Sequence, residues 1–300
     1  MNVVAVRYMA VPRTEYQIPL PILIRKTPSN AYPSFAPIRA CLFDMDGLLI
    51  NTEDLLTTIH NTILARYSAG PMTWPMKARL QGRPLHSAIQ LLLSWAKLDH
   101  RVSVDEYTAQ LHALQEQEFP KAAPLPGVEK LLSVLSGAEN REGRRVELAL
   151  ATSSDRRRFE IKTRHFRGLM GRFVEERRVL GDDARIGRGR GKPCPDIYLL
   201  ALKIINDSLE EGEEKIRPDE CLVFEDTVPG VAAGRRAGMR VIWVPQPGLA
   251  AEFRGREGDV LAGFGEGGSG EFGTLEDGFG EQLVSLVDFP YAKYGIIIGR

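Results

Sequence analysis

Two aspartates, Asp44 and Asp46, follow a short apolar run at residues 40–43 and are separated by a single methionine. Residues two apart in an extended chain point to the same side, so both carboxylates can face one substrate. A carboxylate can attack phosphorus, and the acyl phosphate that forms is labile enough for water to remove it. A second carboxylate can protonate the departing alkoxide and then take a proton from that water. We therefore predict that Asp44 is the nucleophile and Asp46 the general acid and base of a phosphoryl transfer.

Two other segments end in residues that suit a bound phosphate. The run at residues 146–152 ends in Thr152 and continues into Ser153, and a hydroxyl with adjacent backbone N–H groups can hold phosphoryl oxygens. Lys192 precedes Pro193 and Pro195, which stiffen its turn. A fixed ammonium there can neutralise charge on the transferred group. We predict that Thr152, Ser153 and Lys192 bind phosphate.

A third apolar run ends in two acids, Glu225 and Asp226. Carboxylates are hard oxygen donors of the kind that Mg²⁺ prefers, and these two would act together with Asp44. Without a cation, the clustered acids and the substrate phosphate would concentrate more negative charge than Lys192 alone could balance. The sequence therefore predicts Mg²⁺ as a cofactor.

The three runs have the pattern of buried parallel strands, because each is short, apolar and bounded by residues typical of turns or helix starts. A fourth run, at residues 240–244, follows a helical segment at residues 231–237. This alternation of strands and helices is typical of an α/β fold built on a parallel sheet. Ligands of such open sheets bind beyond the carboxyl ends of the strands, so we expect the polar residues to converge there.

Residues 55–123 have a different pattern, with apolar residues at helical spacing such as Leu55, Ile59 and Ile63. We interpret this stretch as an α-helical cap inserted into a core formed by residues 38–54 and 124–300. Prolines and a glycine at residues 124–127 favour a turn where the chain returns to the core. Substrate would be held between cap and core.

The remaining segments lie at the two ends of the chain. Residues 1–37 are interpreted as an N-terminal extension. Residues 262–280 are dense in glycine and have too few apolar groups to order themselves, so we expect a flexible surface loop. Residues 283–298 regain apolar character and could return to the core as an edge element.

Taken in chain order, these motifs resemble those of the haloacid dehalogenase-like superfamily of phosphohydrolases. The four motifs are Asp44-Met-Asp46-Gly47, Thr152, Lys192-Pro-Cys-Pro-Asp196, and Glu225-Asp226 followed by Gly230. The resemblance implies a Rossmann-like core, in which helices flank a parallel sheet, with an α-helical cap inserted after the first motif. It also implies that Asp44, the main-chain carbonyl of Asp46 and Asp226 bind Mg²⁺, with Glu225 as a direct or water-mediated ligand.

The segments around the motifs are most similar to the branch that contains pseudouridine-5′-phosphatases, sugar phosphatases and β-phosphoglucomutases. True dehalogenases lack the second aspartate, so Asp46 favours phosphate chemistry. Asn51 departs from the aspartate of many relatives, and we interpret it as a helix cap. Gly82 and Arg83 precede a helical run where family members often place specificity residues, although an arginine near a helix start can also be simply solvated.

These features predict a magnesium-dependent phosphomonoester hydrolase that forms an aspartyl phosphate. The expected substrate is a small sugar phosphate or a nucleoside monophosphate such as pseudouridine 5′-phosphate. Two alternatives stay open: a phosphosugar mutase of the β-phosphoglucomutase type, which shares the motifs, and a catalytically idle binding protein of the same fold.

Composition excludes several other partners. Lysine plus arginine (39) equals aspartate plus glutamate (39) among 300 residues, so no overall charge favours nucleic acid or an anionic membrane. No apolar run reaches the roughly 18 residues needed to span a bilayer. Three cysteines without paired spacing favour a reducing compartment, and we predict the cytoplasm. Basic residues within 1–37 leave mitochondrial import open as an alternative to the cytoplasm. For the oligomeric state, we favour a monomer.

Overall fold

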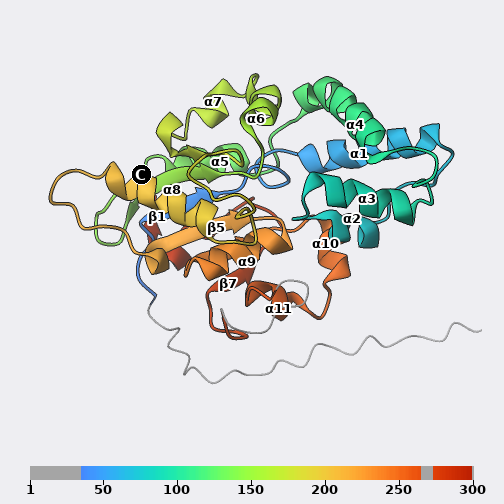
Figure 1. Cartoon of the computed structure of the whole chain (residues 1–300). Helices are drawn as coiled ribbons and strands as arrows, with labels where there is room; N and C mark the ends of the chain where they lie inside the picture. The colour runs from blue at the N-terminus through green and yellow to red at the C-terminus, as the bar shows by residue number, and fades with distance from the viewer. Residues whose placement is uncertain (1–34, 265–272, 299–300) are drawn as a thin grey trace, which may run out of the picture. The chain divides into compact units, whose positions relative to one another are not determined.

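The computed structural model describes residues 35–264 and 273–298, and its core is a six-stranded sheet (Figure 1). Every pair of neighbouring strands in this sheet is parallel. In spatial order the strands are β4 (Arg178–Val179), β3 (Glu147–Ala151), β1 (Ala40–Phe43), β5 (Cys221–Glu225), β6 (Arg240–Trp243) and β7 (Gly280–Gln282). The central strand β1 is completely buried, which explains why its sequence is continuously apolar instead of alternating.

Helices cover both faces of the sheet, as the alternating direction of strand side chains requires. Phe43 faces a cluster that includes residues of α5 (Val128–Leu135), α6 (Arg156–Thr163) and α7 (Arg167–Met170). Leu42 faces the opposite cluster, to which α8 (Asp196–Asp207), α9 (Val228–Arg236), α10 (Pro247–Glu252) and α11 (Glu257–Leu261) contribute. The predicted α/β core with a helix-flanked parallel sheet is confirmed.

A helical cap is inserted between β1 and α5 and has its own apolar core. It consists of α1 (Thr52–Arg66), α2 (Trp74–Leu80), α3 (Leu85–Trp95), α4 (Val104–Glu118) and the short helix η1 (Phe119–Lys121). Ile63, Leu92 and Leu111, from three of these helices, are buried together. A reciprocal capping box between Ser103 and Glu106 starts α4.

The two linkers of the cap are joined by Asn51 and Ala123. The Asn51 backbone N–H donates to the Ala123 carbonyl at 3.0 Å, and the Asn51 side-chain oxygen accepts from the Ala123 N–H at 2.7 Å. The Asn51 side chain makes no capping bond to α1. Asn51 therefore occupies the N-cap position of α1, as interpreted, but its side chain bonds to the opposite linker instead of to the helix.

The C-terminal segment returns to the core at two places. Strand β7 forms one edge of the sheet, and β8 (Ile296–Ile297) pairs antiparallel with β2 (Glu139–Asn140). Part of the predicted glycine-rich loop, residues 265–272, lies outside the described residues, whereas Gly280 already belongs to β7. Residues 1–34 of the N-terminal extension also lie outside them, whereas Phe35 packs edge-on against Phe279. Short helices η2 (Glu175–Arg177), η3 (Pro218–Glu220) and η4 (Tyr291–Tyr294) complete the connections.

None of the described helices is both long enough and apolar enough to pass through a membrane.

Candidate active site

A cavity of about 480 Å³ lies where the carboxyl ends of the central strands meet the cap. Its wall includes Asp44 after β1, Ser153 after β3, and Lys192 from the turn before α8. Asp46 also lines it, and Thr152 lies next to Asp46, with 3.5 Å between the Thr152 hydroxyl and an Asp46 carboxylate oxygen. Segments far apart in the chain therefore bring the predicted acids, hydroxyls and amine to one place.

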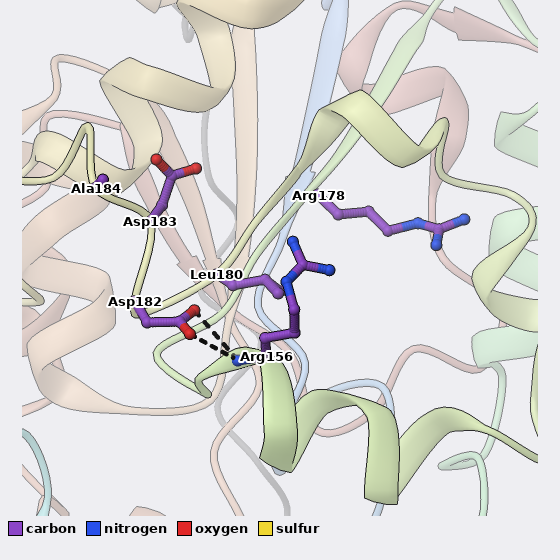
Figure 2. A pocket seen from close by; sticks show the side chains of 6 residues that line it. All are labelled: Arg156, Arg178, Leu180, Asp182, Asp183 and Ala184. Atoms are coloured by element: carbon purple, nitrogen blue, oxygen red, sulfur yellow. Dashed lines mark hydrogen bonds between the residues drawn. The ribbon is translucent and has the colours of Figure 1, made fainter.

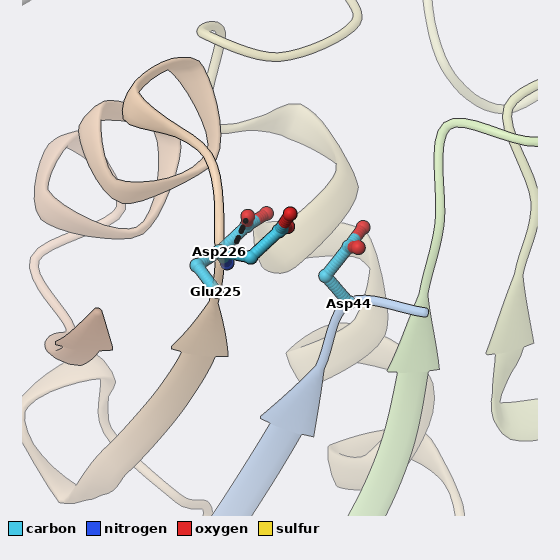
Figure 3. Close-up of side chains that lie close together, drawn as sticks. All are labelled: Asp44, Glu225 and Asp226. Carbon is cyan, nitrogen blue, oxygen red and sulfur yellow. Dashed lines mark hydrogen bonds between the residues drawn. The ribbon is translucent and has the colours of Figure 1, made fainter. Parts of the chain in front are cut away.

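Three carboxylates form the buried acidic cluster of Asp44, Glu225 and Asp226, in which one oxygen from each lies within 4.8 Å of the others. Figure 3 shows Asp44 at the end of one strand, facing the two acids at the end of its neighbour. Burial raises the pKa of Asp44 to about 7, although the Lys192 ammonium acts in the opposite direction. Burial, followed by the charge of Asp44, raises the pKa of Asp226 well above its usual value. The cluster therefore has a deficit of positive charge.

Lys192 is the cation that the fold places against this cluster. Its ammonium lies 2.5 Å from an Asp44 oxygen and 2.6 Å from a Glu225 oxygen, and it donates to the Ala151 carbonyl at 3.0 Å. Burial disfavours the charged form, but the two carboxylates outweigh it and raise the pKa of Lys192 above its usual value.

The oxygens of Glu225 are already engaged by the protein. One accepts from the Tyr198 hydroxyl at 2.6 Å, and the other accepts from the N–H groups of Asp226 and Thr227 at 3.2 and 3.3 Å. Asp226 differs, because its buried Oδ1 has no hydrogen-bond partner. An orphaned carboxylate oxygen beside two other acids fits a bound divalent cation, since Mg²⁺ takes oxygen ligands and supplies the missing charge.

Gly230, in the first turn of α9, makes room for Glu225. A Cβ at this position would lie 1.9 Å from the Glu225 carboxyl carbon. Gly230→Ala is therefore expected to lower the free energy of unfolding by about 1–3 kcal/mol. Urea denaturation of the metal-free protein measures the change. Gly137→Ala is the control, because Gly137 is exposed and has open space around it; equal midpoints for the two variants would contradict this packing role.

Asp46 is held by side chains that the sequence interpretation did not select. Its Oδ1 accepts from the Thr52 hydroxyl at 2.6 Å and from the Lys162 ammonium at 2.7 Å. Its Oδ2 accepts from the Ser154 hydroxyl at 2.7 Å and, more weakly, from Thr152 at 3.5 Å. Burial opposes ionisation, but Lys162 and the hydroxyls outweigh it and hold the pKa of Asp46 below its usual value. Ser153, in contrast, lines the cavity but is not one of the residues that donate a hydrogen bond to Asp46.

The predicted cap residues Gly82 and Arg83 form part of the cavity wall. The cap also supplies Leu56, Gln115 and Phe119 to this wall. Gly82 has a φ of +72°, and a Cβ there would lie 2.6 Å from a side-chain carbon of Pro229 on α9. A glycine thus lets the cap loop approach the core closely. The Arg83 side chain donates to the carbonyl of Arg79 at 2.6 Å, which orders its stem at the cavity wall.

A second, smaller cavity of about 280 Å³ lies beside β4 (Figure 2). It is lined by Arg156, Arg178, Leu180, Asp182, Asp183 and Ala184. The Asp182 carboxylate accepts from the Arg156 backbone N–H at 3.2 Å, so this acid is used at the start of α6. None of the acids of the buried acidic cluster lines this cavity.

Comparison with known families agrees with the site geometry. The family model described as haloacid dehalogenase-like hydrolase matches residues 38–238. This chain belongs to that family. The matched residues span the strand ends that supply Asp44, Thr152 and Asp226, so the resemblance of the four motifs is confirmed.

Individual members of the haloacid dehalogenase-like family are similar over most of the chain. A Saccharomyces cerevisiae protein named "Probable pseudouridine-5′-phosphatase" is 40% identical over 259 residues, covering 86% of this chain and 98% of its own length. The mitochondrial (DL)-glycerol-3-phosphatase 1 of Arabidopsis thaliana is 32% identical, covering 74% and 68% respectively. A solved haloacid dehalogenase family hydrolase from Deinococcus radiodurans R1, with bound phosphate and sodium, is 25% identical with a TM-score of 0.53, covering 71% and 83%.

Proposed function

We propose that this protein is a magnesium-dependent phosphomonoester hydrolase that acts through an aspartyl phosphate on Asp44. The observation that supports it most directly is that Asp44, Asp46 and Lys192 line one cavity at the cap, with Asp226 beside Asp44 in the buried acidic cluster. Membership of the hydrolase family and relatives named as phosphatases support the same activity.

The residues have distinct roles in this mechanism. Asp44 attacks phosphorus, and Asp46 protonates the leaving oxygen and later deprotonates the hydrolytic water. Lys192, held beside Asp44, stabilises negative charge on the transferred group. The hydroxyls of Thr152 and Ser153 and the N–H of Ser153 hold its oxygens, whereas the Thr152 N–H donates to the Val179 carbonyl at 3.0 Å.

The residues that would hold Mg²⁺ are Asp44, Asp226 and the main-chain carbonyl of Asp46. Glu225 joins through a water molecule, because both its oxygens already accept protein donors. When bound, the ion neutralises the acids and the phosphate and aligns them for attack. The unpartnered Oδ1 of Asp226 supports this assignment.

The cavity also supports the substrate class. Its volume of about 480 Å³ accommodates a phosphate with a sugar or a small nucleoside. Leu56 and Phe119 supply apolar surface, and Gln115 and Arg83 supply polar groups, to the cap side of the wall. We assign substrate selection to these side chains with Gly82, and take pseudouridine 5′-phosphate as the first candidate.

A substrate panel tests the proposal. The purified protein is assayed with Mg²⁺ against pseudouridine 5′-phosphate, other nucleoside monophosphates, glycerol 3-phosphate and hexose phosphates, and released inorganic phosphate is measured. We expect release from at least one small ester. Isomerised sugar phosphate without released phosphate would identify a mutase instead. If no ester is turned over, the result would favour the catalytically idle binding protein.

We place the enzyme in the cytoplasm. Its three cysteines are all free thiols, as expected in a reducing compartment. Fluorescence microscopy of the full-length protein with a C-terminal tag tests this, and a mitochondrial signal would contradict it; loss of that signal on deletion of residues 1–37 would show that these residues direct import.

A further inference from the structure

Lys162 is a buried cation beside the cavity that has no role in the mechanism above. It lies in the last turn of α6, and its side chain is only 4% exposed. Its ammonium donates to Asp46 at 2.7 Å and to the Ser154 hydroxyl at 2.8 Å. A lysine that is buried so completely and donates to a reacting group is not a solvated surface residue.

Another side of the ammonium faces the cap, and Lys162 also forms part of the cavity wall. The Lys162 nitrogen lies 4.5 Å from the centre of the Phe119 ring, and Phe119 belongs to η1, where the chain returns from the cap. An aromatic face attracts a cation and excludes water from it. Lys162 is therefore held between Asp46, Ser154 and Phe119, and its ammonium is largely shielded from bulk solvent.

The same contacts define the orientation of Asp46. One carboxylate oxygen is held by Lys162 and Thr52, and the other by Ser154, which Lys162 also contacts. Lys162 thus bonds to Asp46 directly and through Ser154. General acid catalysis needs such fixation, because a proton is transferred efficiently only when donor and acceptor are within hydrogen-bond reach and aligned.

We propose that Lys162 is a positioning residue that fixes the Asp46 carboxylate for proton transfer at the leaving oxygen. This inference rests on the proposed phosphatase function. Asp46 takes up a proton as the phosphate binds, which offsets the added negative charge. In the first step the Asp44 oxygen bonds to phosphorus, the bond from phosphorus to the leaving oxygen breaks, and that oxygen takes this proton from Asp46. In the second step water bonds to phosphorus and gives its proton to Asp46, and the bond from phosphorus to Asp44 breaks. Lys162 keeps its protons throughout.

The leaving group distinguishes this role from a purely structural ion pair. An alkoxide is a poor leaving group and needs the proton, whereas p-nitrophenolate departs without it. Misplacing Asp46 should therefore slow alkyl phosphates selectively. A general loss of structure would slow both kinds of ester equally.

The test is Lys162→Met, which keeps the length of the side chain and removes the charge. We expect kcat for an alkyl phosphate to fall about 100-fold, with KM little changed, and kcat for p-nitrophenyl phosphate to fall less than about 5-fold. Lys162→Arg should recover part of the alkyl phosphate activity. Lys203→Met, on the exposed surface of α8, is the matched control and should leave both activities unchanged.

A second variant covers the case in which Lys162→Met does not fold. Ser154→Ala removes the hydroxyl that joins Lys162 to Asp46 and should show the same selectivity with a smaller effect. Equal losses on both esters in the folded variants, or a change in KM alone, would overturn the positioning role. Absence of phosphate release by the wild-type protein would instead overturn the proposed function itself.

Discussion

Asp44→Asn is expected to lower kcat by at least about 10⁴-fold while the protein stays folded. Asparagine has nearly the shape of aspartate, but its amide is a poor nucleophile and cannot form the acyl phosphate. The substitution also removes a carboxylate from the buried acidic cluster, whose mutual repulsion is already unfavourable. Lys192 keeps its contact with Glu225, so the site does not lose all its ion pairing.

Two measurements establish the role of Asp44. Steady-state phosphate release gives the loss of turnover, and mass spectrometry of rapidly quenched enzyme detects a phosphoryl group on the wild-type protein that the variant lacks. Asp54→Asn is the matched control, since it makes the same chemical change on the exposed surface of α1. Turnover by Asp44→Asn near that of the control would contradict the nucleophile assignment.

Residues of the site that follow strand ends were predictable from sequence. Asp44, Thr152 and Asp226 each follow a continuous apolar run, and parallel strands present their carboxyl ends at one edge. Lys162 gave no comparable signal, because it lies in a helix beginning with three arginines and only tertiary packing buries it. Thr52 also has an ordinary helix-start sequence, and its contact with Asp46 depends on the turn between β1 and α1.

The fold shows the same division between local and tertiary determinants. Strand β1 was predictable because a buried central strand must be apolar, whereas β7 has the sequence Gly280-Glu-Gln282 and is a strand because it pairs with β6. The partner of the Asn51 side chain was not predictable for a similar reason, since Ala123 lies 72 residues away in the chain. The local sequence predicts an element such as β1, whose apolar residues mark it as buried. It does not predict contacts that depend on residues brought together only in the folded protein.

Removing divalent cations is expected to abolish turnover and to lower the melting temperature. Binding of Mg²⁺ at about 100 times its dissociation constant would stabilise the protein by about 2.7 kcal/mol, or roughly 4 °C for a chain of this size. Thermal scans with EDTA and with added Mg²⁺ measure this shift. Asp226→Asn removes the negative charge and one of the two carboxylate oxygens beside Asp44 and should reduce the shift, whereas Asp219→Asn, at a half-exposed acid outside the cavity, should not.

The increase in melting temperature caused by Mg²⁺ should depend on pH, and the titration of Asp44 sets the direction of this dependence. Its pKa is raised to about 7 in the folded protein, so the folded state binds more protons than the unfolded chain between about pH 4 and 7. The metal-free protein therefore loses stability as the pH rises toward 7, and at pH 8 Asp44 is ionised, so that a bound cation then stabilises the folded protein most. At pH 6 protons compete with Mg²⁺ for the same carboxylate. We expect a larger Mg²⁺-induced shift at pH 8 than at pH 6, and equal shifts would show that Asp44 is not a metal ligand. Asp46 cannot produce this trend, because its pKa is lowered and its stabilising contribution is lost only in more acidic solution.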